Sequence, residues 1–246
     1  MNTISSIDNQ INHAANQYKP PSNTEKLKYS LKERGFAHLP GLIEKELLQA
    51  LREECHRLLG SHGIERDFLM KQTANTPRRM VNVRQQDIST NGKIIPALYK
   101  SEAMKHLFEE IAGCQFMPCP YKPEEFIINA LFKSGNTHGW HWDDYKYGIV
   151  FAVEVPEKEN GGYVQVVPNS RWNRQRPSVE DVLFDSVIHS FRLEPGDAYI
   201  IRTDTSMHRV SEINDGAKRV VVNMVWAAAD EVDRVVDHST MEELFS

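Results

Sequence analysis

From residue 125 onward the sequence is a succession of short apolar runs separated by turn-forming residues. The runs span residues 125–132, 147–154, 162–168 and 219–226, and glycine, proline, asparagine and aspartate cluster between them. Runs of this length, bounded by such residues, are typical of strands. Several short strands with few helices between them predict a sandwich or jelly roll. The sequence therefore predicts a mainly β protein with flanking α-helices.

Two amphipathic helices are predicted ahead of these strands. In residues 44–59 leucines recur at helical spacing, and Gly60 can end the helix. In residues 101–112 an apolar stripe follows Ser101, whose side chain can cap the first turn, and Gly113 ends the segment. Amphipathic helices of this kind can brace one face of a sheet.

The chain has 246 residues, 40% of them hydrophobic, which suits one domain with an all-β core and helical additions. Residues 1–23 are rich in Asn, Ser, Gln and Pro, so we expect a flexible arm that is disordered or packs on a partner. Residues 24–246 are expected to form the domain, with helical support in 24–120, the β core in 121–230 and a C-terminal helix or lid in 231–246.

Residues 137–144, Thr-His-Gly-Trp-His-Trp-Asp-Asp, offer two metal ligands. On an extended strand, residues i and i+2 point to the same face, so His141 and Asp143 can converge on one ion. One His-x-Asp match is weak evidence in a chain with 10 histidines. A later turn and apolar strand deliver a third candidate ligand, His208. Two histidines and one carboxylate leave three coordination positions open, as in non-haem Fe(II) oxygenases.

An arginine begins the last apolar run. Arg219 precedes a β-branched stretch that is typical of a buried strand, and a buried arginine needs an anionic partner. The simpler alternative is an arginine at the exposed start of a strand, paired with a surface carboxylate. The order His-x-Asp, distal His and Arg favours an anionic ligand beside a metal.

With these residues in this order, the chain resembles the Fe(II)/2-oxoglutarate-dependent oxygenases. The resemblance implies a double-stranded β-helix, a cupin-like jelly roll, as the core. It also implies that His141, Asp143 and His208 hold Fe(II), that Arg219 binds the distal carboxylate of the co-substrate 2-oxoglutarate, and that O2 takes the last position on the metal. Residues 35–42 resemble the opening strand common in this superfamily.

Residues 160–170 resemble a turn in the middle of the superfamily's barrel, with Asn169 where a glycine is usual. Asparagine tolerates left-handed backbone angles. The turn is therefore expected to form, with Asn169 in that conformation.

A closer resemblance is to the small carrier-independent halogenases of free amino acids and to their lysine-hydroxylase relatives. The shared segment is Thr-His-Gly-Trp-His-Trp, followed by an acidic residue and a tyrosine. In the halogenases a glycine stands at the position of Asp143 and leaves a coordination site for chloride. Because this chain retains the carboxylate, the resemblance implies a hydroxylase of a free L-amino acid, lysine first, that converts 2-oxoglutarate to succinate and CO2.

The resemblance also implies which residues bind the amino acid. Arg78 is expected to bind the α-carboxylate, His138 and Asp144 the α-amino head, and Glu124 with Asn223 a side-chain ammonium. Each has a simpler alternative: Arg78 can belong to a solvated loop, and Glu124 can be the polar start of a strand. The relatives carry an aromatic residue over the substrate near the C-terminus, and this tail has no tryptophan, which leaves lid closure and substrate identity open.

Composition narrows the partners. A net charge of -5 argues against a nucleic-acid substrate, because repair oxygenases need a basic groove. The one basic patch, Arg171, Arg174 and Arg176, lies in a polar loop and is expected to be solvated. Without a signal peptide, a membrane span or a zinc-like cysteine pattern, a cytoplasmic enzyme that acts on a small molecule is expected, and a homodimer is compatible with the sequence.

Two other functions stay open. The first is a hydroxylase of another small molecule or of a carrier-bound amino acid; an acidic pair such as Glu124 and Asp144 facing the pocket favours a free amino acid instead. The second is a non-catalytic jelly roll that binds a metal as a sensor. Arg219 argues against it, because a structural metal site does not require that arginine.

Overall fold

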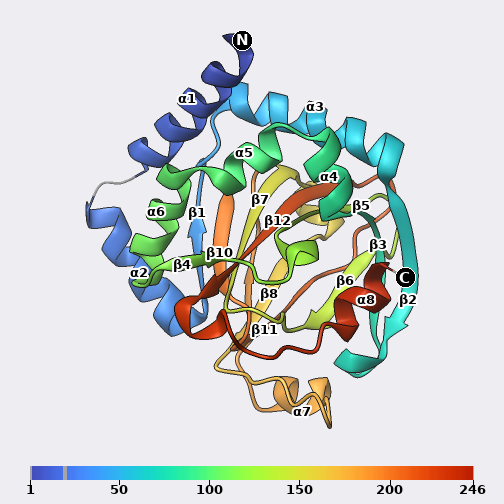
Figure 1. The fold of residues 1–246 in the computed structure, drawn as a ribbon. Helices are drawn as coiled ribbons and strands as arrows, with labels where there is room; N and C mark the ends of the chain where they lie inside the picture. Colours follow the sequence, from blue (N-terminus) through green and yellow to red (C-terminus); the bar gives the residue numbers. More distant parts are fainter. Residues whose placement is uncertain (1, 19–20, 246) are drawn as a thin grey trace.

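A computed structural model describes residues 2–18 and 21–245 and has a curled antiparallel sheet at its centre (Figure 1). Its strands are β1 (Phe36–Leu39), β2 (Ile64–Met70), β3 (Thr76–Val83), β4 (Phe116–Pro118), β5 (Phe126–Leu131), β6 (Thr137–His141), β7 (Tyr147–Glu154), β8 (Val164–Pro168), β9 (His189–Phe191), β10 (Ala198–Arg202), β11 (Ser206–Val210) and β12 (Arg219–Ala228). These twelve strands of the described chain form one sheet in the order β1-β10-β7-β12-β5-β3-β6-β11-β8-β9, with β2 on β3 and β4 on β12.

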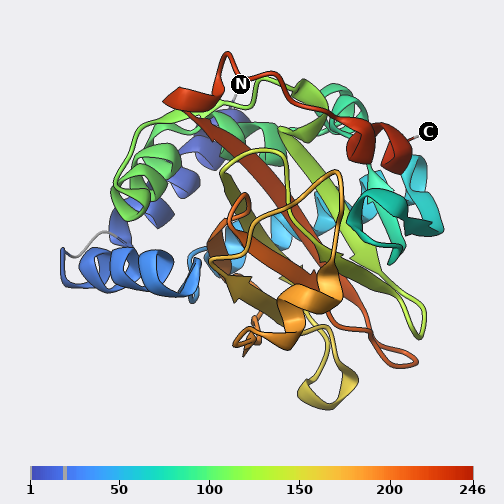
Figure 2. The ribbon, with the colours of Figure 1, turned by 90° about the horizontal axis from the view of Figure 1, so that it is seen from below.

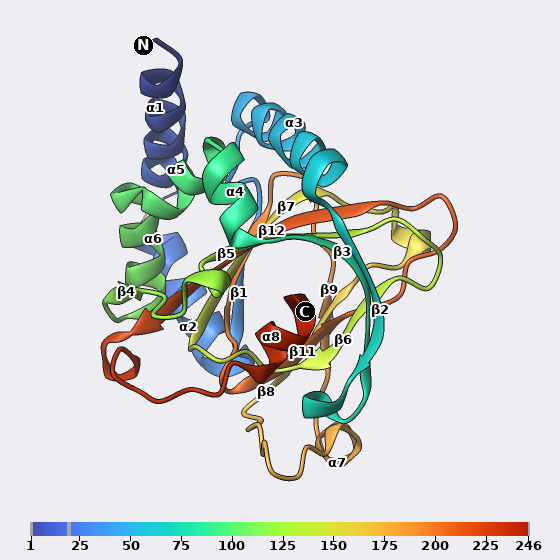
Figure 3. The ribbon, with the colours of Figure 1, turned by 45° about the vertical axis from the view of Figure 1, so that its right-hand side comes forward.

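The sheet curls until its two ends meet. Among the described strands, β1 pairs only with β10 and β9 only with β8. Phe36 of β1 nevertheless stacks on Phe191 of β9, with the ring centroids 4.3 Å apart. Figure 3 looks along the resulting roll and shows the C-terminal helix α8 (Ser239–Phe245) across it. The predicted jelly-roll fold is confirmed.

Helices cover one face of the sheet. The remaining α-helices are α1 (Asn2–Gln17), α2 (Pro21–Arg34), α3 (Lys45–His62), α4 (Gln85–Asn91), α5 (Ile94–Lys100), α6 (Glu102–Ala112) and α7 (Val179–Phe184). Figures 1 and 2 show α1, α5 and α6 gathered on one side, and α7 standing apart from them. Both predicted helices are confirmed, as α3 and α6, but α3 continues through Gly60, which was expected to end it, and ends before Gly63. The Ser101 hydroxyl accepts a hydrogen bond from the Met104 N–H at 3.2 Å. Over the described ranges, no helix combines the length and the apolar character needed to cross a bilayer.

Strand β12 separates the helix-covered core from the inside of the roll. Alternate residues pack into the core that the helices share: Val220, Val222, Met224 and Trp226. The intervening residues line the cavity inside the roll: Arg219, Val221, Asn223 and Val225. The two-residue period of a strand therefore places Arg219 and Asn223 on one interior face.

The N-terminal segment differs from the flexible arm predicted for residues 1–23. Residues 2–17 form α1, and Ile11, Ala14 and Ala15 are buried in the core shared by the helices. Residues 11, 14 and 15 share one helix face, which is enough to dock a helix that is otherwise polar. Residues 1, 19 and 20 of the predicted arm lie outside the described residues.

The β core also includes residues outside the predicted range of 121–230. Strand β1 confirms the opening strand expected in residues 35–42, but β2 to β4 come from a segment expected to be helical support. Strand β3 joins the two halves of the roll by pairing with both β5 and β6. For its Pro77-Arg78-Arg79 start, a solvated loop had been left open as the alternative. Asn169 follows β8 with a φ of 55°, as the turn prediction required.

A buried carboxylate joins helix α3 to helix α5. The Glu54 carboxylate is 6% exposed and accepts hydrogen bonds from the backbone N–H groups of Lys93, Ile94 and Ile95 at 2.7–3.1 Å. It thereby satisfies donors that the start of α5 leaves without a partner inside the helix. We expect Glu54→Ala to lower the free energy of unfolding by about 3 kcal/mol, because these donors would stay buried and unpaired.

Urea denaturation monitored by circular dichroism measures this effect. Glu53→Ala is the matched control, because that exposed neighbour only accepts a bond from Gln49, and its cost should stay within about 0.5 kcal/mol. Equal midpoints for the two variants would contradict the capping role of Glu54.

Candidate metal centre and substrate pocket

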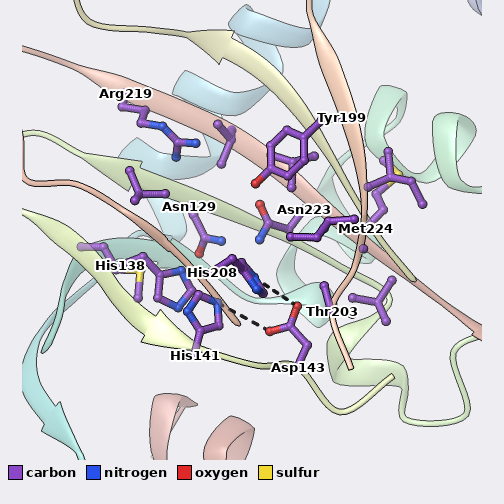
Figure 4. Close-up of a pocket in the computed structure, with 18 of the residues that line it drawn as sticks. Asn129, His138, His141, Asp143, Tyr199, Thr203, His208, Arg219, Asn223 and Met224 are labelled. Carbon is purple, nitrogen blue, oxygen red and sulfur yellow. Dashed lines mark ion pairs between the residues drawn. The ribbon is translucent and has the colours of Figure 1, made fainter. Parts of the chain in front are cut away.

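Three side chains with metal-binding atoms converge inside the roll (Figure 4). His141 is the last residue of β6, and His208 pairs with it across from β11. The Asp143 carboxylate lies between them, with Oδ1 3.6 Å from Nε2 of His141 and Oδ2 3.7 Å from Nε2 of His208. One ligand atom from each of the three residues lies within 4.8 Å of the others.

The local backbone differs from the expected strand. β6 ends at His141, so Asp143 follows the strand instead of lying on it. The Asp143 N–H donates to the Thr203 carbonyl at 3.3 Å, which ties this loop to the end of β10. With this hydrogen bond in place, the Asp143 carboxylate points toward the two imidazoles. The three side chains therefore converge as expected, but Asp143 does so from a loop and not from the strand.

Backbone carbonyls orient both imidazoles. Nδ1 of His141 lies 2.7 Å from the Gly139 carbonyl, and Nδ1 of His208 lies 3.0 Å from the Ser206 carbonyl. Only a protonated Nδ1 can donate to a carbonyl, so Nε2 of each ring keeps its lone pair free. Burial, with positive neighbours including Arg78, holds the pKa of His141 well below its usual value, so this ring is neutral. Two neutral imidazoles and a carboxylate are a donor set that fits Fe(II).

Arg219 lies deep in the same cavity, at the start of β12. Its side chain is buried, and among the described residues its Nε and Nη2 atoms have no hydrogen-bond partner. Burial lowers the pKa of Arg219, an effect that the nearby Tyr199 opposes. Burial raises the pKa of Tyr199 to about 12, so this phenol keeps its proton at neutral pH. A buried guanidinium with unpaired donors fits an anion that the protein itself does not supply.

A second cavity, on the side of α8, is lined by two of the three candidate ligands, His141 and Asp143. Its walls include all five residues expected to bind an amino acid: Arg78, Glu124, His138, Asp144 and Asn223. The first cavity also contains His138, Asn223 and Asp143, so the candidate metal centre lies between the two. The structure thus brings together residues from β3, β6 and β12 and from the segments before β5 and after β6.

Arg78 is a buried cation and not part of a solvated loop. It is 3% exposed, and it donates to the hydroxyl groups of Thr73 and Thr76 at 3.1 and 3.0 Å. Burial lowers the pKa of Arg78 to about 10, so it stays charged at neutral pH. Burial and Arg78 together hold the pKa of His138 well below its usual value. The pocket therefore presents one permanent positive charge beside a neutral imidazole.

Two carboxylates line the same pocket as this cation. Glu124 and Asp144 are both 4% exposed, and each has one buried oxygen without a hydrogen-bond partner in the described chain. Burial, with Asp144 beside it, raises the pKa of Glu124 well above its usual value. His238 approaches both, with its Nδ1 3.7 Å from Glu124 and 3.4 Å from Asp144.

Sequence reasoning missed two of these residues. Arg174, expected to be solvated, instead forms an ion pair with the buried Asp144. His238, in a tail that lacks tryptophan, stacks on Tyr121 with the ring centroids 3.8 Å apart. For His238, the sequence offered one signal, an isolated imidazole ring next to the predicted C-terminal helix. Thr240, Met241 and Leu244 of α8 line the pocket beyond it.

Several solved structures are similar in fold to this chain. The epimerase SnoN from nogalamycin biosynthesis, solved with Fe3+, alpha ketoglutarate and nogalamycin RO, is similar with a TM-score of 0.67 and 14% identity, over 85% of each chain. The carbocyclase SnoK from the same biosynthesis gives 0.66 and 15% identity, over 83% of this chain and 84% of that one. A prolyl-4-hydroxylase from Pseudomonas putida gives 0.57 and 15% identity, over 83% and 98%. At these identities the likeness establishes the jelly-roll fold of 2-oxoglutarate oxygenases.

Sequence comparison identifies the family. No curated protein matches the sequence significantly. The family model described as Halogenase D matches residues 19–246, which include every residue of the candidate metal centre and of both cavities. Because this match extends over nearly all of the sequence, the chain belongs to the Halogenase D family.

Proposed function

We propose that the protein is an Fe(II)- and 2-oxoglutarate-dependent hydroxylase of a free L-amino acid, with L-lysine as the first candidate substrate. The observation that carries the proposal is the Asp143 carboxylate, which lies within 3.7 Å of both imidazoles. His141, Asp143 and His208 would hold the metal, and Arg219 would hold the distal carboxylate of 2-oxoglutarate through a charge-assisted pair of hydrogen bonds. When bound, iron and 2-oxoglutarate supply the oxidising chemistry for an unactivated C–H bond.

The protein's own residues orient the substrate and keep water away. Arg78 would receive the α-carboxylate, His138 and Asp144 the α-amino group, and Glu124 with Asn223 the side-chain ammonium. Lysine carries two ammonium groups and one carboxylate; besides the candidate metal ligand Asp143, this pocket offers two carboxylates and one arginine. Charged groups are buried at acceptable cost only when each is paired, so this balance supports a basic amino acid. The segment carrying His238 and α8 would close the pocket.

A screen of the twenty amino acids tests the proposal. Each is incubated with the protein, Fe(II), ascorbate and 2-oxoglutarate, and succinate formation is measured. We expect stimulation by lysine above ornithine and arginine, and none by acidic amino acids, whose side chains would meet Glu124. Stimulation by no free amino acid would favour a different small molecule or a carrier-bound amino acid. Cytoplasmic location and the absence of nucleic-acid and membrane partners are further proposals. The net charge of -5 argues against a nucleic-acid partner, and the three free cysteines suit a reducing compartment.

Chlorination is the second candidate, because the family takes its name from a halogenase. Asp143 argues against it, since a carboxylate bound to the metal occupies the position that chloride would need. We expect the wild-type product to be hydroxylated even in excess chloride. Mass spectrometry of the lysine product with and without chloride measures this, and chlorinated lysine from the unmodified protein would remove Asp143 from the ligand set.

The Asp143→Gly variant extends this prediction. It opens a position on the metal, yet halogenation also requires surroundings that stabilise the halide and keep hydroxyl away from the substrate carbon. We expect the variant to lose most hydroxylation and to give little or no chlorinated product. Abundant chlorinated lysine would mean that these surroundings already favour halide.

A further inference from the structure

The loop between β8 and α7 extends one arginine to the substrate pocket. The Arg174 guanidinium forms an ion pair with Oδ1 of Asp144 through its Nη2 atom. Its Nη1 atom donates to the Asp237 carbonyl at 2.8 Å, and the group lies 3.7 Å from the centroid of the Trp172 ring. The side chain of Arg174 is 33% exposed, so it can move outward into solvent without disturbing a packed core.

Asp144 cannot move outward in the same way. Its side chain is 1% exposed and lines the pocket, and Arg234 also donates to its backbone carbonyl. A carboxylate buried to this extent is stable only beside a cation, because burying an unpaired charge is very costly. If Arg174 leaves, Asp144 needs another positive partner, for which the substrate cation and His238, whose Nδ1 lies 3.4 Å away, are the candidates.

We propose that Arg174 is a specificity-determining residue whose guanidinium holds Asp144 in the free protein and is displaced by the α-ammonium group of the substrate. The proposal rests on the proposed function, which assigns the α-amino group to Asp144. A molecule without a cation at that position leaves the ion pair intact and gains nothing from Asp144. The exchange selects α-amino acids over analogues that lack the α-amino group.

A ligand that must displace Arg174 binds with a lower apparent affinity, because only the fraction of the protein in which Asp144 is free of Arg174 can bind it. Arg174→Gln removes the competing charge and keeps most of the side-chain length. We expect it to lower the Kd of L-lysine about fivefold, the size set by the population of a partly exposed ion pair. The Kd of ε-aminocaproate, which is lysine without the α-amino group, should not change.

Anaerobic calorimetry of the protein loaded with Fe(II) and 2-oxoglutarate measures both constants without turnover. Arg176→Gln, the same substitution at an exposed position of the same loop, is the matched control and should match wild type. Arg174→Lys keeps a cation at this position and should bind lysine nearly as wild type does. In an Asp144→Asn background, Arg174→Gln should have no further effect on lysine binding.

Each outcome has a distinct meaning. If Arg174→Gln weakens lysine and ε-aminocaproate equally, Arg174 only anchors the C-terminal segment through Asp237, and the competition is overturned. An unchanged lysine Kd in Arg174→Gln overturns it too, while the amino-acid hydroxylase proposal stands. Failure of every amino acid to bind either wild type or Arg174→Gln overturns both proposals. If Arg174→Gln does not fold, as judged by circular dichroism, lysine binding by Arg174→Lys decides: a loss larger than tenfold contradicts the competition.

Discussion

Replacing His208 by alanine should abolish substrate-dependent succinate formation and weaken Fe(II) binding by more than about a hundredfold. Mutation of a residue that only orients a metal ligand already lowers metal affinity about 10- to 100-fold, and loss of the ligand itself should lower it further. His208 offers Nε2 to the site and keeps Nδ1 on the Ser206 carbonyl, so the variant removes an imidazole ligand that the backbone already orients. A two-ligand site retains neither the affinity nor the geometry of the facial arrangement. His141→Ala should behave in the same way.

Metal content after dialysis against Fe(II), together with succinate formation, measures the effect. His106→Ala is the matched control, because this histidine lies on the surface and contacts Glu109. Circular dichroism establishes whether each variant folds. A His208→Ala protein with near-normal activity and iron content would remove His208 from the site.

Arg219→Ala should raise the Kd of 2-oxoglutarate by roughly 30-fold or more, which corresponds to the low end of the 2–5 kcal/mol typical of a buried charge pair that loses one partner. The guanidinium is 3% exposed, and the described protein supplies no partner for its Nε and Nη2 atoms. Arg219→Lys should fall between wild type and Arg219→Ala, because an ammonium keeps the charge but not the two parallel donors.

Calorimetry of 2-oxoglutarate binding without oxygen measures these constants. Arg209→Ala serves as the comparison, since Arg209 already donates to Gln165 at 2.6 Å and lies 5.1 Å from the centroid of the Trp140 ring. The Kd of 2-oxoglutarate for Arg209→Ala should stay close to that for wild type. A large increase for Arg209→Ala, with Arg219→Ala unchanged, would transfer the co-substrate role to Arg209.

Tyr199 and Asn129 show why parts of the site were not predictable. Both line the cavity of Arg219, but each lies on an apolar strand where an isolated polar side chain is usually a satisfied core residue. Asn129 accepts a hydrogen bond from Asn82, which lies on β3, a strand that the sequence did not predict. Contacts between strands distant in sequence depend on the order of strands in the sheet, which hydrophobic periodicity does not specify.

The sequence by itself determined the local features whose physics is local. The alternation of β12 placed Arg219 and Asn223 on one face, Ser101 and Gly113 bounded α6, and Asn169 adopted the left-handed turn. These outcomes follow from side-chain direction and backbone preference within a few residues. The order of His141, Asp143, His208 and Arg219 in the chain was sufficient to suggest one shared site.

Only the tertiary structure decided which charges meet. Whether Arg174 is solvated or bound to Asp144 depends on where a long loop folds back, and whether α1 docks depends on a complementary surface on α5 and α6. Burial then changes the chemistry of the same residues: it keeps His141 neutral, raises the pKa of Glu124, and leaves Nε and Nη2 of Arg219 without a partner among the described residues. Desolvation depends on everything that packs around a group, so it belongs to the folded molecule and not to a sequence motif.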